Sequence, residues 1–112
     1  MVTNDKIYYG TELKLNINIE PIGGLSMADY KWEIDVYCNP NKKVTITSED
    51  AINRINAYMV DRDNYVLKVS TKKIGAGMVK CKVVAELPDE NFSDNYRTEV
   101  NVISTGIEII MA

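Results

Sequence analysis

The stretch Gly75–Leu87, GAGMVKCKVVAEL, decides the fold class of this chain. From Val79 onward apolar and polar residues largely alternate, so an extended backbone places one apolar set on a single side of a pleat. Gly77 lies near the start of the stretch and Pro88 directly follows it, as is typical where strands meet loops. The stretch therefore predicts a β-strand with one buried face. The residues expected on that face are Val79, Cys81, Val83, Ala85 and Leu87.

Similar alternation recurs along the rest of the chain and predicts further half-buried strands. The segments are 11–20, 30–38, 43–47, 65–70 and 96–103. The residues expected to face inward are Leu13, Leu15, Ile17 and Ile19; Tyr30, Trp32, Ile34, Val36 and Cys38; Val44 and Ile46; Tyr65, Leu67 and Val69; and Tyr96, Thr98, Val100 and Val102. Turn residues at 39–41 and 61–64 predict two hairpins. About seven or eight strands in one chain indicate an antiparallel sandwich or barrel.

Two segments leave alternatives open. In 48–55, SEDAINRI, Ser48 could cap a short helical turn with an apolar stripe of Ala51, Ile52 and Ile55, or the segment could be a crossover between strands. After a break at 104–106, the segment IEIIM has more apolar side chains than one face of a strand can hold. Either both of its faces are covered, or one faces a partner.

The length, composition and charge of the chain limit the class of protein to which it can belong. A chain of 112 residues fits a single domain, 1–112, and 46% hydrophobic with 26% charged residues is typical of a globular protein. The net charge is −3 and the basic residues are scattered, which disfavours binding to nucleic acid. No apolar run approaches the roughly 20 residues that cross a bilayer, so no membrane segment is predicted.

The residue types exclude several kinds of active site. Histidine is absent, which rules out Ser-His-Asp and Cys-His arrangements and histidine-based metal sites. Cys38 and Cys81 fall on apolar faces, and we expect free buried thiols there rather than a nucleophile or a disulfide. The turn 61–64 resembles the start of a calcium loop but lacks the later glycine and glutamate. The sequence thus predicts no catalytic residue, cofactor or metal.

The order of these features resembles small immunoglobulin-like structural domains of tailed bacteriophages of gut bacteria, including the N-terminal domains of baseplate upper proteins. The matching pieces are Tyr9-Gly10-Thr11 running into LKLNINI, then YKWEIDVYC, NYVLKVSTKKIGAGMVKCKVV and RTEVNVISTGIEI. The resemblance implies an immunoglobulin-like sandwich without the usual disulfide, because Trp32 and Cys38 lie on one strand.

The resemblance to these phage domains also implies a non-enzymatic structural protein of the virion, made in the cytoplasm of the bacterial host. Such a protein would act in the capsid, tail, baseplate or fibre anchor by contacts with other virion proteins and with itself. Apolar residues in expected loops and at the C-terminal edge are the interface candidates: Met27, Phe92, Ile107, Ile109, Ile110 and Met111. The alternative is a module that binds carbohydrate or another ligand through surface tyrosine rings, with Tyr8, Tyr9, Tyr37, Tyr58 and Tyr96 as candidates.

Overall fold

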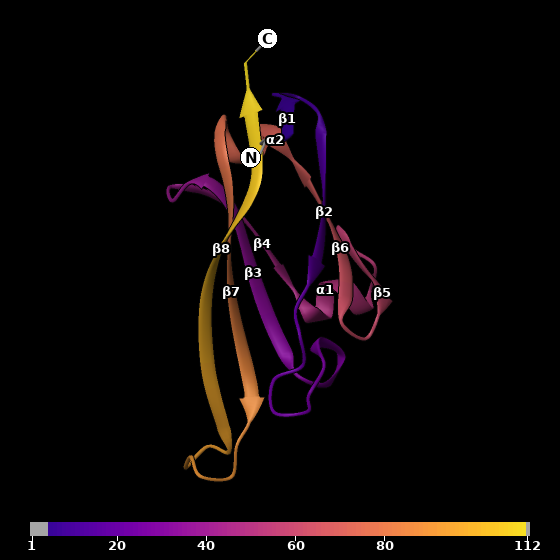
Figure 1. Cartoon of the computed structure of the whole chain (residues 1–112), viewed down its shortest axis with the longest axis vertical. Helices are drawn as coiled ribbons and strands as arrows, with labels where there is room; N and C mark the ends of the chain where they lie inside the picture. Colours follow the sequence, from indigo (N-terminus) through magenta and orange to yellow (C-terminus); the bar gives the residue numbers. More distant parts are fainter. Residues whose placement is uncertain (1–4, 112) are drawn as a thin grey trace.

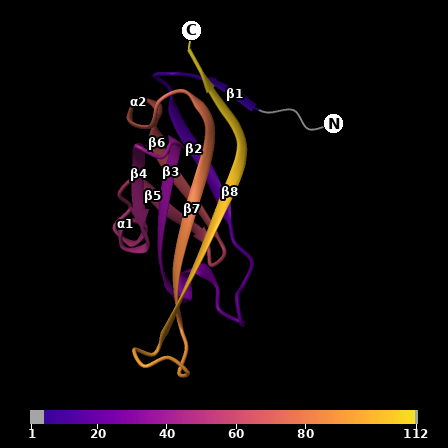
Figure 2. The ribbon, with the colours of Figure 1, turned by 90° about the vertical axis from the view of Figure 1, so that its left-hand side faces the viewer.

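A computed structural model of the chain describes residues 5–111. Two sheets pack face to face as a sandwich (Figures 1 and 2). The five-stranded sheet has the order β1-β8-β7-β3-β4, and the three-stranded sheet has the order β2-β6-β5. The strands are β1 (Asp5–Tyr8), β2 (Glu12–Asn18), β3 (Lys31–Asn39), β4 (Lys42–Thr47), β5 (Ala57–Asp61), β6 (Asn64–Ser70), β7 (Gly77–Pro88) and β8 (Tyr96–Ile110). Three short helical turns are η1 (Met27–Asp29), α1 (Ser48–Ile52) and α2 (Thr71–Ile74).

The prediction of an immunoglobulin-like sandwich of seven or eight strands is confirmed, with eight strands in the described residues. Strands β2, β6 and β5 face β8, β7 and β3, which is the division between sheets found in immunoglobulin-like domains. All pairs are antiparallel except β1 with β8, which run parallel. No helix of residues 5–111 is long and apolar enough to cross a membrane.

Strand β7 lies at the centre of the larger sheet, between β3 and β8. The face predicted to be buried is buried along its whole length, from Val79 to Leu87. It packs with the inner residues of β2, β3 and β6, so the strongest alternating segments of the sequence form the core. Trp32 is in this core, and its ring meets the Tyr65 ring edge-on at a centroid distance of 5.1 Å.

Segment 48–55 begins as a helix, and Thr47 rather than Ser48 caps it. The Thr47 hydroxyl accepts a hydrogen bond from the Asp50 amide, and the Asp50 carboxylate accepts one from the Thr47 amide. Ala51 is buried, but Ile52 and Ile55 are exposed, so the predicted apolar stripe is wrong. Because the helix is only five residues long, it presents a single residue to the core.

Strand β8 differs from the prediction in two ways. It does not end at 104–106: it continues through a bulge at which Gly106 has a φ of 75° and the Thr105 hydroxyl donates to the Val79 carbonyl. Its orientation in the first half is also the reverse of the prediction, because Val100 and Val102 are exposed on the outer face. The inner face there carries Asn101, opposite buried Val83, together with neighbouring polar residues.

Thr71 is the one fully buried polar residue of the described chain, and it fixes the connection between β1 and β2. Its hydroxyl donates to the Thr11 carbonyl and accepts from the Gly10 amide, both at 2.8 Å. Gly10 has a φ of 102°, a conformation that glycine adopts without strain. This cluster turns the chain from the edge of one sheet into the edge of the other.

Candidate functional site

The hairpin β7–β8 is the most prominent feature of the surface. Its two strands and their connecting turn extend beyond the other strands at one end of the molecule (Figures 1 and 2). The turn is held by its own hydrogen bonds, from the Asp89 amide to the Asn95 carbonyl and from the Asn95 amide to the Phe92 carbonyl. Phe92 is 47% exposed within it. The hydrogen-bonded turn thus presents the aromatic ring of Phe92 to solvent.

The outer face of this hairpin carries a row of apolar side chains, which we call the outer stripe: Val84, Val100 and Val102. Val84 and Val100 are direct cross-strand partners. Val100 and Val102 are 52% and 59% exposed, and Tyr96 continues the row toward the turn at 47%. Contiguous exposed apolar side chains on a folded surface usually mark a contact with another molecule.

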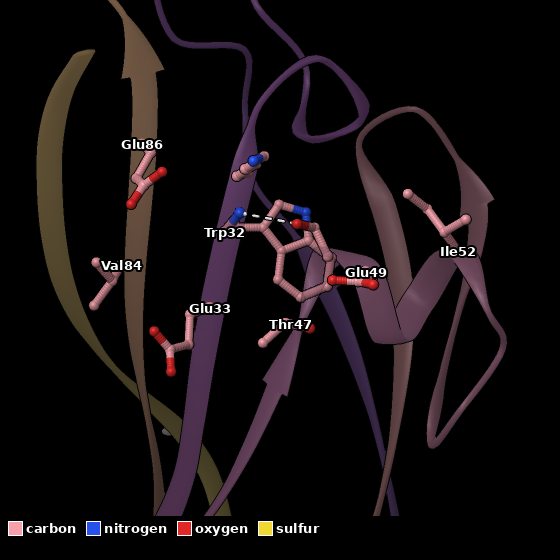
Figure 3. A pocket seen from close by; sticks show the side chains of 9 residues that line it. Trp32, Glu33, Thr47, Glu49, Ile52, Val84 and Glu86 are labelled. Carbon is pink, nitrogen blue, oxygen red and sulfur yellow. Dashed lines mark hydrogen bonds between the residues drawn. The ribbon is translucent and has the colours of Figure 1, made fainter. Parts of the chain in front are cut away.

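A groove runs beside β3 at the same end of the sandwich. It exists because β4 stops at Thr47, opposite Glu33, while β3 continues to Lys31. There the Trp32 amide donates to the Ser48 hydroxyl instead of to a strand, at 3.2 Å. The hollow between β3, β7 and α1 has a volume of about 420 Å³ (Figure 3).

The walls of this groove combine charge with apolar surface. Figure 3 shows Glu33, Glu49 and Glu86 around it, on β3, α1 and β7. A second hollow of about 490 Å³ shares Lys31, Ser48, Ile52 and Glu86 with the first and adds Tyr30, Tyr65 and Tyr96. The indole N–H of Trp32 and the hydroxyl of Tyr30 are buried without a hydrogen-bond partner in the described part of the protein. Both volumes are of a size that accommodates small ligands.

The structure does not bring the predicted interface residues together. Phe92 and Met111 are exposed, as expected for contact residues. The β7–β8 turn, which holds Phe92, and the C-terminal end of β8, which Met111 follows, lie at opposite ends of the molecule (Figure 1). Met27 and Ile109 are 1% exposed, so the expectation that they face a partner is wrong. Ile107 and Ile110 are half-buried, because both faces of the C-terminal part of β8 are partly covered.

Met27 lies on the turn η1, which hydrogen bonds join to the β5–β6 hairpin. Asp29 pairs with Arg62, and its carboxylate also accepts from the Ser26 amide at 2.9 Å. These hydrogen bonds hold the pKa of Asp29 below its usual value. The turn η1 is thereby pressed against the β5–β6 hairpin, with the Met27 side chain directed inward.

The acidic turn at 61–64 is occupied by its own hydrogen bonds. The Asp61 carboxylate accepts from the Asp63 amide at 3.0 Å and from the Asn64 side chain at 2.7 Å. Within residues 5–111, no group of three acidic or cysteine side chains is arranged to hold a metal ion. Asp61 therefore serves the hairpin turn, as the preference of Asp and Asn for turns implies.

Both cysteines are free thiols, and both lie in the larger sheet, on the neighbouring strands β3 and β7. Burial raises the pKa of the Cys81 thiol to about 11 and also raises that of Cys38. The Cys38 thiol donates to the Gly77 carbonyl at 3.4 Å. These settings protect both thiols from ionisation and hence from reaction as thiolates.

The Cys81 thiol gives the stability of the fold a pH dependence. From the ordinary thiol pKa of 9.0 to about 11, the unfolded chain loses this proton while the folded chain keeps it. The free energy of unfolding should therefore fall as the pH rises through this window, and the loss should be smaller in Cys81→Ala. Urea unfolding of both proteins below pH 9 and near pH 11 measures it, and equal losses in the two would contradict the assignment.

The surface residues that sequence reasoning missed are Val100, Val102 and Ile103. All three are exposed, whereas alternation assigned Val100 and Val102 to the core. The signal that bears on this is the neighbouring strand: Asn101 stands opposite Val83, which the β7 pattern already assigned inward. Once strands are paired, the face of β8 follows from that of β7.

Comparisons with known proteins show no family for this chain. No family model matches the chain, and no curated protein matches it. Among solved structures, it is similar to a "putative glycoside hydrolase" from Bacteroides vulgatus ATCC 8482, with a TM-score of 0.45 and 13% identity. The match covers 96% of this chain and 16% of that protein, so the chain spans about a sixth of its length. A likeness of this degree establishes no shared activity.

Proposed function

We propose that this chain is a non-enzymatic structural component of a larger assembly, a tailed-phage particle, and that it acts through protein–protein contacts. The observation that supports the proposal best is the β7–β8 hairpin, which projects from the body and carries the outer stripe and an exposed Phe92. An aromatic side chain on a shaped, projecting turn is the kind of residue that anchors interfaces.

Substitution at the tip of the hairpin tests this function. Phe92→Asp should lower incorporation of the chain into particles about tenfold or more, because loss of an anchoring aromatic residue commonly costs more than 1.4 kcal/mol of binding. Asn91→Asp, which adds the same charge one residue away, should leave incorporation near the wild-type level. Mass spectrometry of particles purified from the host that carries the gene provides the readout.

Thermal unfolding of both variants checks that they fold. Equal incorporation of the Phe92→Asp and Asn91→Asp variants would contradict a role for the hairpin tip. Absence of the wild-type chain from purified particles would contradict the proposed function itself.

A second candidate function is ligand binding, and the groove beside β3 favours it. Three tyrosines line its second hollow, and polar groups converge on the first. Of the tyrosines expected from the sequence, Tyr96 lines the groove, whereas Tyr58 lies under the cationic groups of Arg54 and Lys68. A glycan array probed with the wild-type chain tests carbohydrate binding, and binding that Tyr96→Ala abolishes would support it.

A further inference from the structure

The two sheets have four edges, and three of them carry features that discourage the addition of another strand. The β4 edge has Lys42 and Lys43, and its pairing with β3 shifts register between Tyr37 and Asn39. The β5 edge is only five residues long, and its register with β6 also shifts. The β2 edge alternates charged or amide side chains with its core residues. Lysines, bulges and short length are the usual protections of exposed edges.

The fourth edge lacks these protections over much of its length. Strand β1 covers β8 only at Ile107–Ile110, so residues 96–104 have no strand on their outer side in the described structure. Figure 1 shows this part of β8 along the left-hand margin of the molecule. Its register with β7 is unbroken from Tyr96 to Ser104, and it contains neither lysine nor proline. These nine residues form what we call the open edge.

The backbone of the open edge is suited to pairing. Its outward residues Thr98, Val100 and Val102 are β-branched and favour extended structure. Its two charges, Arg97 and Glu99, pair with each other at 3.3 Å, so the edge has no net charge to repel an approaching strand. An edge of this length without lysine, proline or a bulge, and with β-branched residues on its outer face, is a site for strand addition.

We infer that the open edge binds the open edge of a second copy of this chain, antiparallel and about a two-fold axis, to form one continuous ten-stranded sheet. This inference rests on the proposed assembly function and names the contact. A two-fold contact requires a surface that complements itself. Val100 is the midpoint of 96–104, so an axis through Val100 pairs every residue of the open edge with one of the other copy.

This register matches the side chains of the two copies. On the outer face Val100 meets Val100 of the second copy, and Thr98 meets its Val102. On the inner face Glu99 meets Asn101 of the second copy, and Arg97 meets its Ile103. No like charges are opposed, and the outer stripes of the two copies adjoin across the axis. Such cross-strand apolar pairs stabilise antiparallel sheets, whereas opposed like charges destabilise them.

A disulfide across the axis tests the register. In Val100→Cys the two new thiols oppose each other, with Cα atoms about 4.5 to 5.5 Å apart, a distance that a disulfide spans. Mild oxidation should convert most of this variant to a covalent dimer. In Val102→Cys the two thiols lie four residues out of register, roughly 13 Å apart, and should not join. The wild type, with protected native thiols, should remain uncrosslinked.

The association itself is measured on the wild type. Light scattering after size exclusion should show a dimer that dissociates on dilution. Hydrogen exchange of the amides of residues 97–104 should be faster in the dilute, dissociated protein than in the dimer. Val102→Lys should weaken the dimer about tenfold or more, because lysine protects an edge from pairing. Asn16→Lys, on the β2 edge, should not. Exchange of the unaltered chain keeps the inference testable if a variant fails to fold.

Each outcome decides the inference. A wild type that is monomeric at every concentration overturns it, as does a dimer in which Val102→Cys crosslinks and Val100→Cys does not. Incorporation of a monomeric chain into particles would remove this contact and leave the proposed function standing. A chain that dimerises but is absent from particles would contradict the proposed function and leave this contact in place.

Discussion

Replacing Ile34 with alanine is expected to lower the free energy of unfolding by about 3 kcal/mol, the scale typical of large-to-small substitutions in a close-packed core. Ile34 is fully buried at the middle of β3, between β4 and β7. Truncation removes apolar contacts and leaves a cavity that the flanking strands cannot close. Urea denaturation followed by tryptophan fluorescence measures the change.

Ile52 provides the matched control, since it is the same residue type at 80% exposure. Ile52→Ala should alter the free energy of unfolding by no more than about 0.5 kcal/mol, as is usual for surface substitutions. Similar losses in the Ile34→Ala and Ile52→Ala variants would show that α1 packs differently from the structure.

Replacing Thr71 with valine is expected to lower the free energy of unfolding by about 2 kcal/mol, although the two side chains have nearly the same shape. Valine can neither accept from the Gly10 amide nor donate to the Thr11 carbonyl, and each of the two lost hydrogen bonds contributes roughly 0.5–1.5 kcal/mol. The Thr11 carbonyl keeps its bond from the Thr71 amide, so the Gly10 amide is the group left unpaired. Denaturation measures the loss, and hydrogen exchange locates it.

Thr71→Ser separates the hydroxyl from the methyl group. Serine keeps the hydrogen bonds and loses one methyl, worth about 0.8 kcal/mol. The Gly10 amide should exchange slowly in the wild type and in Thr71→Ser but quickly in Thr71→Val. Slow exchange at Gly10 in Thr71→Val would contradict the role assigned to the hydroxyl.

The centre of the fold could be predicted from the sequence because its strands are packed on one side by a complete opposing sheet. In β2, in β3 up to Val36 and in β7 from Val79 onward, burial alternates as predicted, and Trp32 is in the core. Alternation predicts the buried residues reliably where one face of a strand packs against the core and the other faces solvent along the whole strand.

The prediction was wrong where a strand extends past its opposing sheet. The first half of β8 faces the chain around Ile19 and Ile22 rather than a strand, so polar Glu99 and Asn101 are tolerated on its inner side. Valines then remain on the outer face, where alternation alone mistook them for core. The candidate contact surface was missed for this reason, since its apolar residues had been assigned to the interior.

Met27 and Ile52 show a different limit, which is local geometry set by residues outside the apolar pattern of the segment. Met27 is buried on the turn η1, which the pair between Asp29 and Arg62 joins to the β5–β6 hairpin. Ile52 is exposed because Thr47 sets where the short helix begins and thus which residue points inward. Neither consequence follows from apolar spacing within the segment itself.

The parallel pairing of β1 with β8 has a consequence for how the chain folds. Asp5 stands opposite Ile107, so this ladder joins segments separated by nearly the whole described sequence. Contacts of such long sequence separation form late and slow folding, because the intervening chain must first lose its freedom. Until β1 docks, Ile107–Ile110 are uncovered as well, so the unpaired edge of β8 then extends along the whole strand. During that stage, association between chains through the unpaired edge can be faster than the docking of β1. We therefore expect the yield of refolded protein to fall steeply as the protein concentration is raised.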